Sequence, residues 1–174
     1  MTQHYTLASF QSSQCIPYLL KQTHELMHSC AQEAYLSGGD LSFTQFLVLL
    51  KLKEGIATTP SSLCRLMYHD TGAFTRLLDQ LEERGFVLRT RAPSDRRMIV
   101  LKLTPAGEAK LAELMPMLVD MLNVALTDFS PKEFSELTRL LNKLRNSVLV
   151  AREQLASDSS AGNSVAGNSM RGAE

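Results

Sequence analysis

Basic side chains gather in one segment of this chain, although the whole sequence balances 18 basic against 18 acidic residues. From Ser61 to Lys102 there are eight arginines or lysines and five acids, a net charge of +3, which leaves −3 for the remainder. From Arg84 to Lys102, six basic residues accompany a single acid, Asp95. Such a local excess is typical of a surface that binds the phosphates of a nucleic acid. The alternative is a solvated basic face of some other module.

Cysteines and histidines are the other residues that could do chemistry. Cys15, Cys30 and Cys64 are odd in number and form no C-x-x-C pair, which argues against a disulfide framework and a thiolate zinc site. Buried, unreactive thiols are the default, and oxidation sensing is an alternative. His24 and His28 share a helix face, as metal-ligating pairs do, but no second cluster accompanies them. We therefore predict neither a metal nor a cofactor.

Signatures of enzymes and of membrane proteins are missing from the sequence. It has no G-x-S-x-G elbow, no glycine-rich phosphate loop and no H-E-x-x-H motif, so we predict that the protein is not an enzyme. No apolar run approaches the roughly 18 residues that span a bilayer. The N-terminus lacks the basic start and apolar stretch of a signal peptide. We expect a cytoplasmic protein with no membrane partner.

Two helices are predicted before the basic segment. The first runs from about Phe10 to Leu36, and Pro17 is expected to bend its first turns. Ser42 and Gln45 then have the spacing of a capping box, in which each side chain binds the other residue's backbone N–H. The second helix ends near Glu54.

Two shorter helices follow. Thr59 and Pro60 are the expected N-cap and first residue of a third helix that ends near Met67. A fourth helix is capped by Asp70 and stopped at Gly85. It has a buried apolar stripe on one face and small polar residues on the opposite face. The stripe consists of Phe74, Leu77, Leu78 and Leu81.

Strand-like segments then replace the helical pattern. Residues 86–91 and 98–103 are rich in β-forming residues and flank a polar loop with a proline, which predicts a hairpin. A fifth helix opens at Thr104-Pro105, and a capping box at residues 130–133 opens a sixth. From Ser157 the composition of serine, glycine, asparagine and alanine predicts disorder.

The predicted fold is mainly α with a small β-hairpin wing, a winged helix-turn-helix with dimerisation helices at both ends of the chain. We divide it into an N-terminal dimerisation helix (1–40), a DNA-binding lobe (41–103), C-terminal dimerisation helices (104–156) and a disordered tail (157–174). The end helices are more apolar than a lone winged module needs, which favours a homodimer.

Three motifs occur in a fixed order: LSFTQF at residues 41–46, TRLLDQLEERGFV at 75–87, and SDRR at 94–97 followed by LTPAG at 103–107. Through them, the stretch from Leu41 to Leu111 resembles the MarR (multiple antibiotic resistance regulator) family. The resemblance implies a homodimer built from the first, fifth and sixth helices, with two DNA-binding lobes. The pair Leu63-Cys64 departs from the family's frequent Leu-Ala pair and puts a thiol beside the lobe.

A recognition helix in the major groove reads base edges through its exposed side chains. We expect these contacts from the fourth helix, with Ser61 and Ser62 of the third helix donating to phosphates. Arg76 has the geometry for a bidentate contact to guanine. The recognition residues are Thr71, Gly72, Ala73, Thr75 and Arg76.

The hairpin loop supplies the remaining predicted DNA contacts. Arg96 and Arg97 are expected to enter a minor groove, whose negative potential attracts guanidinium groups. Asp95 would hold the loop's shape by pairing with one of these arginines, and the family's Asp-x-Arg motif matches Asp95 and Arg97. The expected partner is double-stranded operator DNA, pseudo-palindromic, with half-site centres about 10 bp apart.

The family resemblance also implies regulation by a small ligand, an aromatic carboxylate or phenol, bound between the dimerisation helices and the lobe. Binding would release a repressor from its operator. The alternatives are a repressor that senses oxidants through its cysteines, or a dimeric protein-interaction module without DNA binding. The candidate ligand-binding residues are Tyr18, His24, His28, Tyr35, Phe46 and Arg65.

Overall fold

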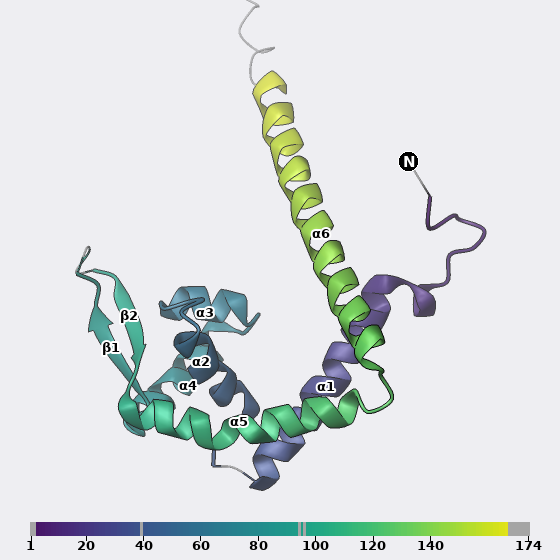
Figure 1. Ribbon diagram of the computed structural model, residues 1–174. Helices are drawn as coiled ribbons and strands as arrows, with labels where there is room; N and C mark the ends of the chain where they lie inside the picture. Colours follow the sequence, from purple (N-terminus) through teal and green to yellow (C-terminus); the bar gives the residue numbers. More distant parts are fainter. Residues whose placement is uncertain (1–2, 39, 94, 96, 167–174) are drawn as a thin grey trace, which may run out of the picture. The chain divides into compact units, whose positions relative to one another are not determined.

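The computed structural model describes residues 3–38, 40–93, 95 and 97–166, and it has the predicted order of helices and one hairpin (Figure 1). The chain forms two compact units, the first ending at Ala125 and the second beginning at Leu126. The prediction of a mainly helical fold with a small hairpin is therefore confirmed. The elements are η1 (Ser12–Gln14), α1 (Ile16–Gly38), α2 (Phe43–Lys53), α3 (Pro60–Leu66), α4 (Thr71–Glu83), β1 (Val87–Arg91), β2 (Ile99–Leu103), α5 (Pro105–Ala125) and α6 (Pro131–Ala166).

Reciprocal caps fix the starts of α2 and α3. Ser42 Oγ accepts a hydrogen bond from the Gln45 backbone N–H at 3.2 Å, and Gln45 Oε1 accepts one from the Ser42 N–H at 3.0 Å. Thr59 and Ser62 make the same exchange at the start of α3. Each box satisfies donors that a helix N-terminus otherwise leaves without partners. The capping box at Ser42 and the N-cap at Thr59 were both predicted, whereas the second box was not.

Glycines end α2 and α4. Gly55 and Gly85 have φ values of +68° and +72°, in the left-handed region that favours glycine. A Cβ at either position would meet nothing within 4 Å, so the backbone conformation and not crowding is what requires glycine there.

The wing is an antiparallel hairpin in which Val87 pairs with Leu103 at its base. Leu101, near the middle of β2, is buried, and its N–H donates to the Thr58 carbonyl at 2.7 Å. That bond joins β2 to the segment immediately before α3. The wing therefore rises from the same core that holds the helices.

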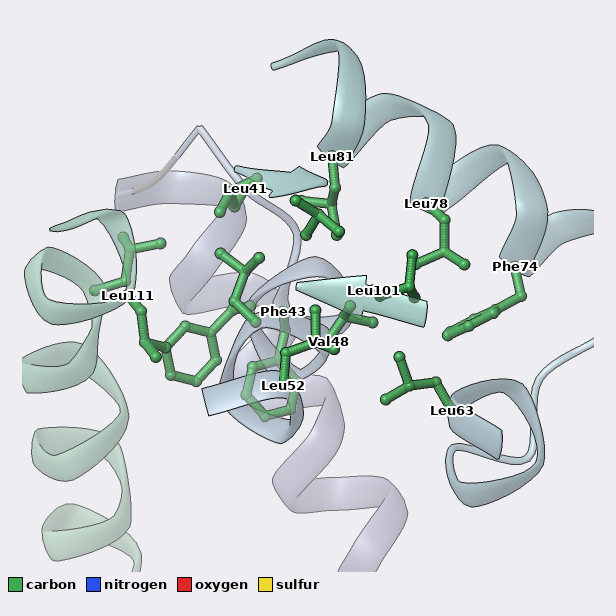
Figure 2. Packing of buried hydrophobic residues seen from close by; sticks show 14 of the residues in the cluster. Leu41, Phe43, Val48, Leu52, Leu63, Phe74, Leu78, Leu81, Leu101 and Leu111 are labelled. Carbon is green, nitrogen blue, oxygen red and sulfur yellow. The ribbon is translucent and has the colours of Figure 1, made fainter. Parts of the chain in front are cut away.

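One hydrophobic core holds the first unit together, and its side chains point toward one another from several elements (Figure 2). The apolar stripe of α4 supplies three buried members, while Leu77 is only half-buried. The other labelled members come from α2, α3, β2, α5 and the segment before α2. They are Leu41, Phe43, Val48, Leu52, Leu63, Leu101 and Leu111.

The first helix differs from its prediction at its start. α1 begins at Ile16 and not at Phe10, and the residues before it include the short turn η1. Pro17 consequently lies in the first turn of α1, where its missing N–H would have no helical partner anyway. It marks the beginning of the helix and does not bend its interior.

The second unit consists mainly of α6. The predicted capping box is present: Ser130 N–H donates to Glu133 Oε2 at 2.9 Å, and Glu133 N–H donates to Ser130 Oγ at 3.3 Å. α6 extends to Ala166, past Ser157, where disorder was expected to begin. The segment from Ser157 to Ala166 lacks proline, the residue least compatible with a helix interior, although its Gly162 has low helix propensity. Across the described residues, no helix is both long and apolar enough to cross a membrane.

Candidate nucleic-acid interface

Helices α3 and α4 form the helix-turn-helix. They contact each other, with Leu63 of α3 and Phe74 and Leu78 of α4 buried in the core. Tyr68, in the turn between them, has a φ of +54°, an uncommon conformation for a residue with a side chain. The buried faces leave the opposite face of α4 available to a partner.

The start of α4 is held by Asp70, whose Oδ1 accepts from the backbone N–H groups of Gly72 and Ala73 at 2.9 and 3.1 Å. The predicted recognition residues are all exposed on this helix. We call them the reading face: Thr71, Gly72, Ala73, Thr75 and Arg76. Arg76 makes no ion pair in the described part of the chain, so its guanidinium is available to a base.

The two serines of α3 differ in availability. Ser61 is exposed. The Ser62 hydroxyl accepts from the Thr59 N–H at 3.1 Å and donates to the Thr59 carbonyl at 2.9 Å. Its proton is therefore already used by the helix cap, whereas the Ser61 hydroxyl is exposed and makes one longer contact, 3.3 Å to Thr59 Oγ1.

Asp95 binds the backbone of the wing loop. Asp95 Oδ1 accepts from the backbone N–H of Arg97 at 2.9 Å, and the Asp95 carbonyl accepts from the Met98 N–H at 3.0 Å. Among the described residues, the partner of the Asp95 carboxylate is a backbone amide, and the predicted pairing with Arg96 lies outside them. Arg97 is exposed, and its side chain makes no ion pair among the described residues. Arg96 lies outside the described residues.

Two arginines from the basic segment are bound by acids of their own chain. Arg84 pairs with Asp40 and also donates to the Asp40 carbonyl at 2.6 Å. Arg89 Nη1 lies 2.7 Å from Asp79 Oδ1 and 2.9 Å from Glu82 Oε2. These pairs correct the electrostatic interpretation of the sequence: both arginines were counted as part of a phosphate-binding surface, and both hold the lobe together.

Lys110 of α5 completes the cluster around Asp40. Its Nζ lies 3.0 Å from Asp40 Oδ1 and 2.8 Å from Glu113 Oε1. The hydrogen bond from Lys110, with the nearby Arg84 charge, holds the pKa of Asp40 below its ordinary value of 3.8. The same network raises the pKa of Lys110, mainly through its hydrogen bond to Glu113. The cluster ties the loop before α2 to both α4 and α5.

A polar link between α2 and α4 was missed by sequence reasoning. Gln45 Nε2 donates to Gln80 Oε1 at 2.9 Å, and Gln45 is only 8% exposed. The sequence identified Gln45 as a capping residue. Its second bond depends on how two distant helices pack, which no local pattern encodes.

The two candidate ligand-binding histidines lie together at the surface of the first unit. His24 and His28, on α1, line a hollow of about 200 Å³ against apolar side chains of α2 and α5. They also border a second hollow of about 470 Å³ along α1 itself. The apolar lining of the first is Met27, Phe43, Leu47, Leu118, Met121 and Leu122.

The other predicted ligand residues lie elsewhere. Tyr35 and Phe46 are 0% exposed and pack with ring centroids 4.8 Å apart, so they belong to the core and not to an open pocket. The Tyr35 hydroxyl donates to the Leu114 carbonyl at 3.0 Å, and burial raises the pKa of Tyr35 to about 12. Tyr18 is exposed on α1. Arg65 lines a separate hollow between α3 and α4.

The cysteines form no disulfide. Cys15 and Cys64 are half-buried and Cys30 is exposed. The rings of His24 and His28 lie 6.1 Å apart, and within the described ranges no third histidine, cysteine or acid joins them in a metal-binding group.

Comparison with known proteins gives one family. The MarR family profile matches residues 41–99. The HTH-type transcriptional regulator SarZ of Staphylococcus aureus is 31% identical over 137 residues, which are 75% of this chain and 89% of SarZ. The multiple antibiotic resistance protein MarR of Salmonella typhimurium is 41% identical over 75 residues, 43% of this chain. That match spans about half, 52%, of the length of the Salmonella protein.

Comparison with solved structures finds proteins of the same family. A variant of Escherichia coli MarR complexed with operator DNA is 29% identical, with a TM-score of 0.63 over 78% of this chain and 99% of its own. Bordetella bronchiseptica BpsR, in a structure on regulation of its DNA binding by 6-hydroxynicotinic acid, is 22% identical. Its TM-score is 0.65 over 78% of this chain and 96% of its own, and at this identity it shows the fold alone.

Proposed function

This chain belongs to the MarR family of transcriptional regulators, and from that premise we propose that it is a homodimeric repressor released from its operator by a small aromatic ligand. The observation that carries the DNA-binding part is the reading face. Its side chains are small or polar, all are exposed, and it begins at the capped end of a helix whose other face is in the core. A major groove accommodates a helix of this kind.

The wing supports the same proposal. Arg97 extends from a loop that Asp95 fixes through the backbone. A guanidinium held in this way fits a minor groove or its phosphates without first having to leave an intramolecular ion pair. We propose that Arg97 contributes affinity for many DNA sequences, whereas Arg76 selects one base pair.

Dimerisation is supported by exposed apolar side chains in each unit. On α1 these include Ile16, Leu19, Leu20 and Leu26, all more than two-fifths exposed. On α6 they include Phe134, Leu137, Leu140, Leu141 and Val148. Exposed faces made of several large apolar side chains are typical of surfaces that a partner covers. A second copy of the chain is the proposed partner, and its symmetry would be mirrored by a pseudo-palindromic operator.

The effector part of the proposal rests on the hollow beside His24 and His28. It joins an apolar lining to imidazole groups, a combination suited to an aromatic ring that carries a carboxylate or hydroxyl. It also lies where α1 and α5 meet α2, the first helix of the DNA-binding lobe. A ligand there could alter the position of α2 and thereby the lobe.

A salt titration tests DNA binding. Fluorescence anisotropy would measure the affinity of the protein for DNA flanking its own gene, across a series of salt concentrations. We expect log Kd to rise with log salt, and Arg97→Ala to reduce the slope by about 1, as loss of one phosphate contact does. Arg139→Ala, which changes an exposed α6 arginine paired with Glu136, is the matched control and should leave the slope unchanged.

The result also separates the alternatives. Binding that is weak, insensitive to salt and unaffected by Arg97→Ala would reject the DNA-binding proposal and favour a protein-interaction module. Specific binding that is lost after peroxide treatment, and restored by a thiol reductant, would replace ligand release by oxidation sensing.

A further inference from the structure

Helices α2, α3 and α4 end in the same hydrogen-bonded motif. In each, the N–H of the first residue after the C-cap donates to the carbonyl three positions back, and the next N–H donates to the carbonyl five positions back. The first residues after the C-caps are Gly55, Tyr68 and Gly85, with φ values of +68°, +54° and +72°. Glycine is the usual residue in this motif, because a Cβ disfavours the left-handed conformation. The chain departs from that preference at Tyr68.

This departure costs stability. The left-handed conformation of a residue with a side chain lowers the ratio of folded to unfolded protein by about 5–30-fold. The conformation at Tyr68 is held by two backbone bonds, from its own N–H to the Arg65 carbonyl at 3.3 Å and from the His69 N–H to the Cys64 carbonyl at 3.2 Å. Glycine would make the same two bonds without the cost. The fold therefore requires this backbone conformation at position 68 and does not require a tyrosine.

The side chain of Tyr68 is not used to pack the lobe. The residue is 96% exposed, and among the described residues its phenol group makes no hydrogen bond and no ring contact. Its two neighbours contact the core instead. Met67 is half-buried against it, and the His69 ring lies 5.9 Å from the ring of the buried Phe74. Tyr68 is thus a large aromatic side chain that extends into solvent from a turn whose other residues are anchored.

The turn lies next to the proposed DNA-binding surface. Tyr68 is two positions before Asp70, the N-cap of α4, and three before Thr71, where the reading face begins. A recognition helix enters the major groove with its N-terminal residues against the bases. The residues just before that end consequently lie at the edge of the groove, beside the phosphates. This step rests on the proposed DNA-binding function.

We propose that Tyr68 is a further operator contact, whose hydroxyl donates a hydrogen bond to a backbone phosphate at the edge of each half-site. Tyrosine hydroxyls are among the groups that bind DNA phosphates. Since every sequence presents the same phosphates, the contact adds affinity and does not select a base. The side chain thereby gives the turn a function that glycine lacks, in return for the lower stability.

The first test is Tyr68→Gly, which should change stability and DNA affinity in opposite directions. The urea midpoint should rise, because glycine adopts a positive φ without strain. The operator Kd, measured by fluorescence anisotropy, should rise by about tenfold, because each of two subunits loses one hydrogen bond. A tyrosine with a purely structural role would not produce this result, since a more stable fold gives no reason for weaker DNA binding.

Two further variants separate the hydroxyl from the backbone conformation. Tyr68→Phe keeps the ring and the strained backbone, so the urea midpoint should stay the same while the operator Kd rises by about fivefold. Gly85→Tyr is the matched control, because it puts a tyrosine into the same motif at the other end of α4, about 20 Å along the helix. A Cβ at Gly85 meets nothing within 4 Å. This variant should lower the urea midpoint and leave the operator Kd unchanged.

The contacted phosphate can be located by replacing operator phosphates, one symmetric pair at a time, with uncharged methylphosphonates. At one pair, the replacement should weaken binding by the parent and have little further effect on Tyr68→Phe, because that variant has already lost the bond. Equal operator affinity in the parent, Tyr68→Gly and Tyr68→Phe would overturn the contact. A changed base preference in Tyr68→Gly, read from single-substitution operators, would overturn its assignment to a phosphate. Absence of specific binding by the parent would be a different result, because it rejects the proposed function and this contact with it.

Discussion

Arginines at two places in the lobe have different environments. Near the C-terminal end of α4 and in β1, Arg84 and Arg89 are engaged by acids of the same chain. On the reading face and in the wing loop, Arg76 and Arg97 make no ion pair among the described residues. All four counted equally in the sequence as positive charge. The difference teaches that the net charge of the segment overstates the positive charge that is left unpaired, and that position within the fold decides which arginines are left for the proposed DNA contacts.

One of the paired arginines, Arg84, belongs to a region that we call the joint: Arg84, Asp40 and Lys110 together with Gly107, where the wing meets α5. Thr104 Oγ1 accepts from the Gly107 N–H at 3.0 Å and donates to the Gly85 carbonyl. The joint fixes the hairpin to the helices, while the reading face is the surface that we propose contacts DNA. Substitutions should therefore damage stability in one region and DNA binding in the other.

The largest expected effect is a loss of stability on substitution of Gly107. A Cβ there would lie 2.2 Å from the Phe86 carbonyl oxygen and 2.8 Å from Leu103 Cδ1. Since the carbonyl belongs to the backbone, it can move only with the hairpin. Gly107→Ala should lower the free energy of unfolding by about 3 kcal/mol or more, the upper end for overpacking, as measured by urea denaturation.

Gly85→Ala is the matched control, because Gly85 has room for a Cβ and is strained only by its positive φ. It should cost about 1–2 kcal/mol. Equal losses of unfolding free energy in the two variants would mean that the backbone shifts easily to make room for a Cβ at Gly107. The joint would then be less rigidly packed than the structure indicates.

The next largest expected effect is on operator binding, and it tests the contrast between the arginines with ion pairs and those without. Arg76→Ala should weaken operator binding by about 1–3 kcal/mol and abolish the preference at one base pair. The free energy of unfolding should stay within about 0.5 kcal/mol of the parent, because the side chain is exposed. Arg84→Ala should do the reverse, with a loss of stability of about 1 kcal/mol and the same base preference. Base preference would be read from a panel of single-substitution operators, and a change of preference in Arg84→Ala would contradict the division.

Much of the lobe was predictable because its signals are local. The capping pair Ser42 and Gln45, the N-cap Asp70 and the stop at Gly85 each depend on neighbours a few residues away. The exposed face of α4 followed from the spacing of its buried stripe. These predictions needed only helix geometry and hydrogen-bond chemistry.

The errors concern contacts between distant residues. Nothing in the sequence pairs Arg84 with Asp40, 44 positions away, since that contact exists only once α4 packs near the loop before α2. Tyr35 and Phe46 were assigned to a pocket because aromatic residues suit both ligands and cores, and only their burial separates the two roles. The disordered tail from Ser157 stays a prediction: it was placed by composition alone, while α6 extends to Ala166.

The smallest expected effect is a pH dependence of folding stability that arises from Asp40 in the joint. The folded protein lowers the pKa of Asp40 below its ordinary value of 3.8, chiefly through the hydrogen bond from Lys110. A carboxyl with a depressed pKa contributes stability above its unfolded pKa and loses it as pH falls through the folded pKa. The parent should therefore be more stable than Asp40→Asn at pH 7, by less than about 1 kcal/mol because the side chain is 56% exposed.

That difference should shrink as the pH falls below the ordinary aspartate pKa of 3.8, because the carboxyl becomes protonated first in the unfolded protein and, at lower pH, in the folded one. Urea midpoints at pH 7, 5, 4 and 3 would measure it. Asp120→Asn, which changes an exposed carboxylate of α5 with no ion pair in the described chain, is the control and should show no such convergence. Operator affinity at pH 7 should be the same for Asp40→Asn and its parent, since Asp40 belongs to the joint and not to the reading face. A selective loss of affinity in this variant would show that the joint also sets the position of the reading face, and that the two regions act as one.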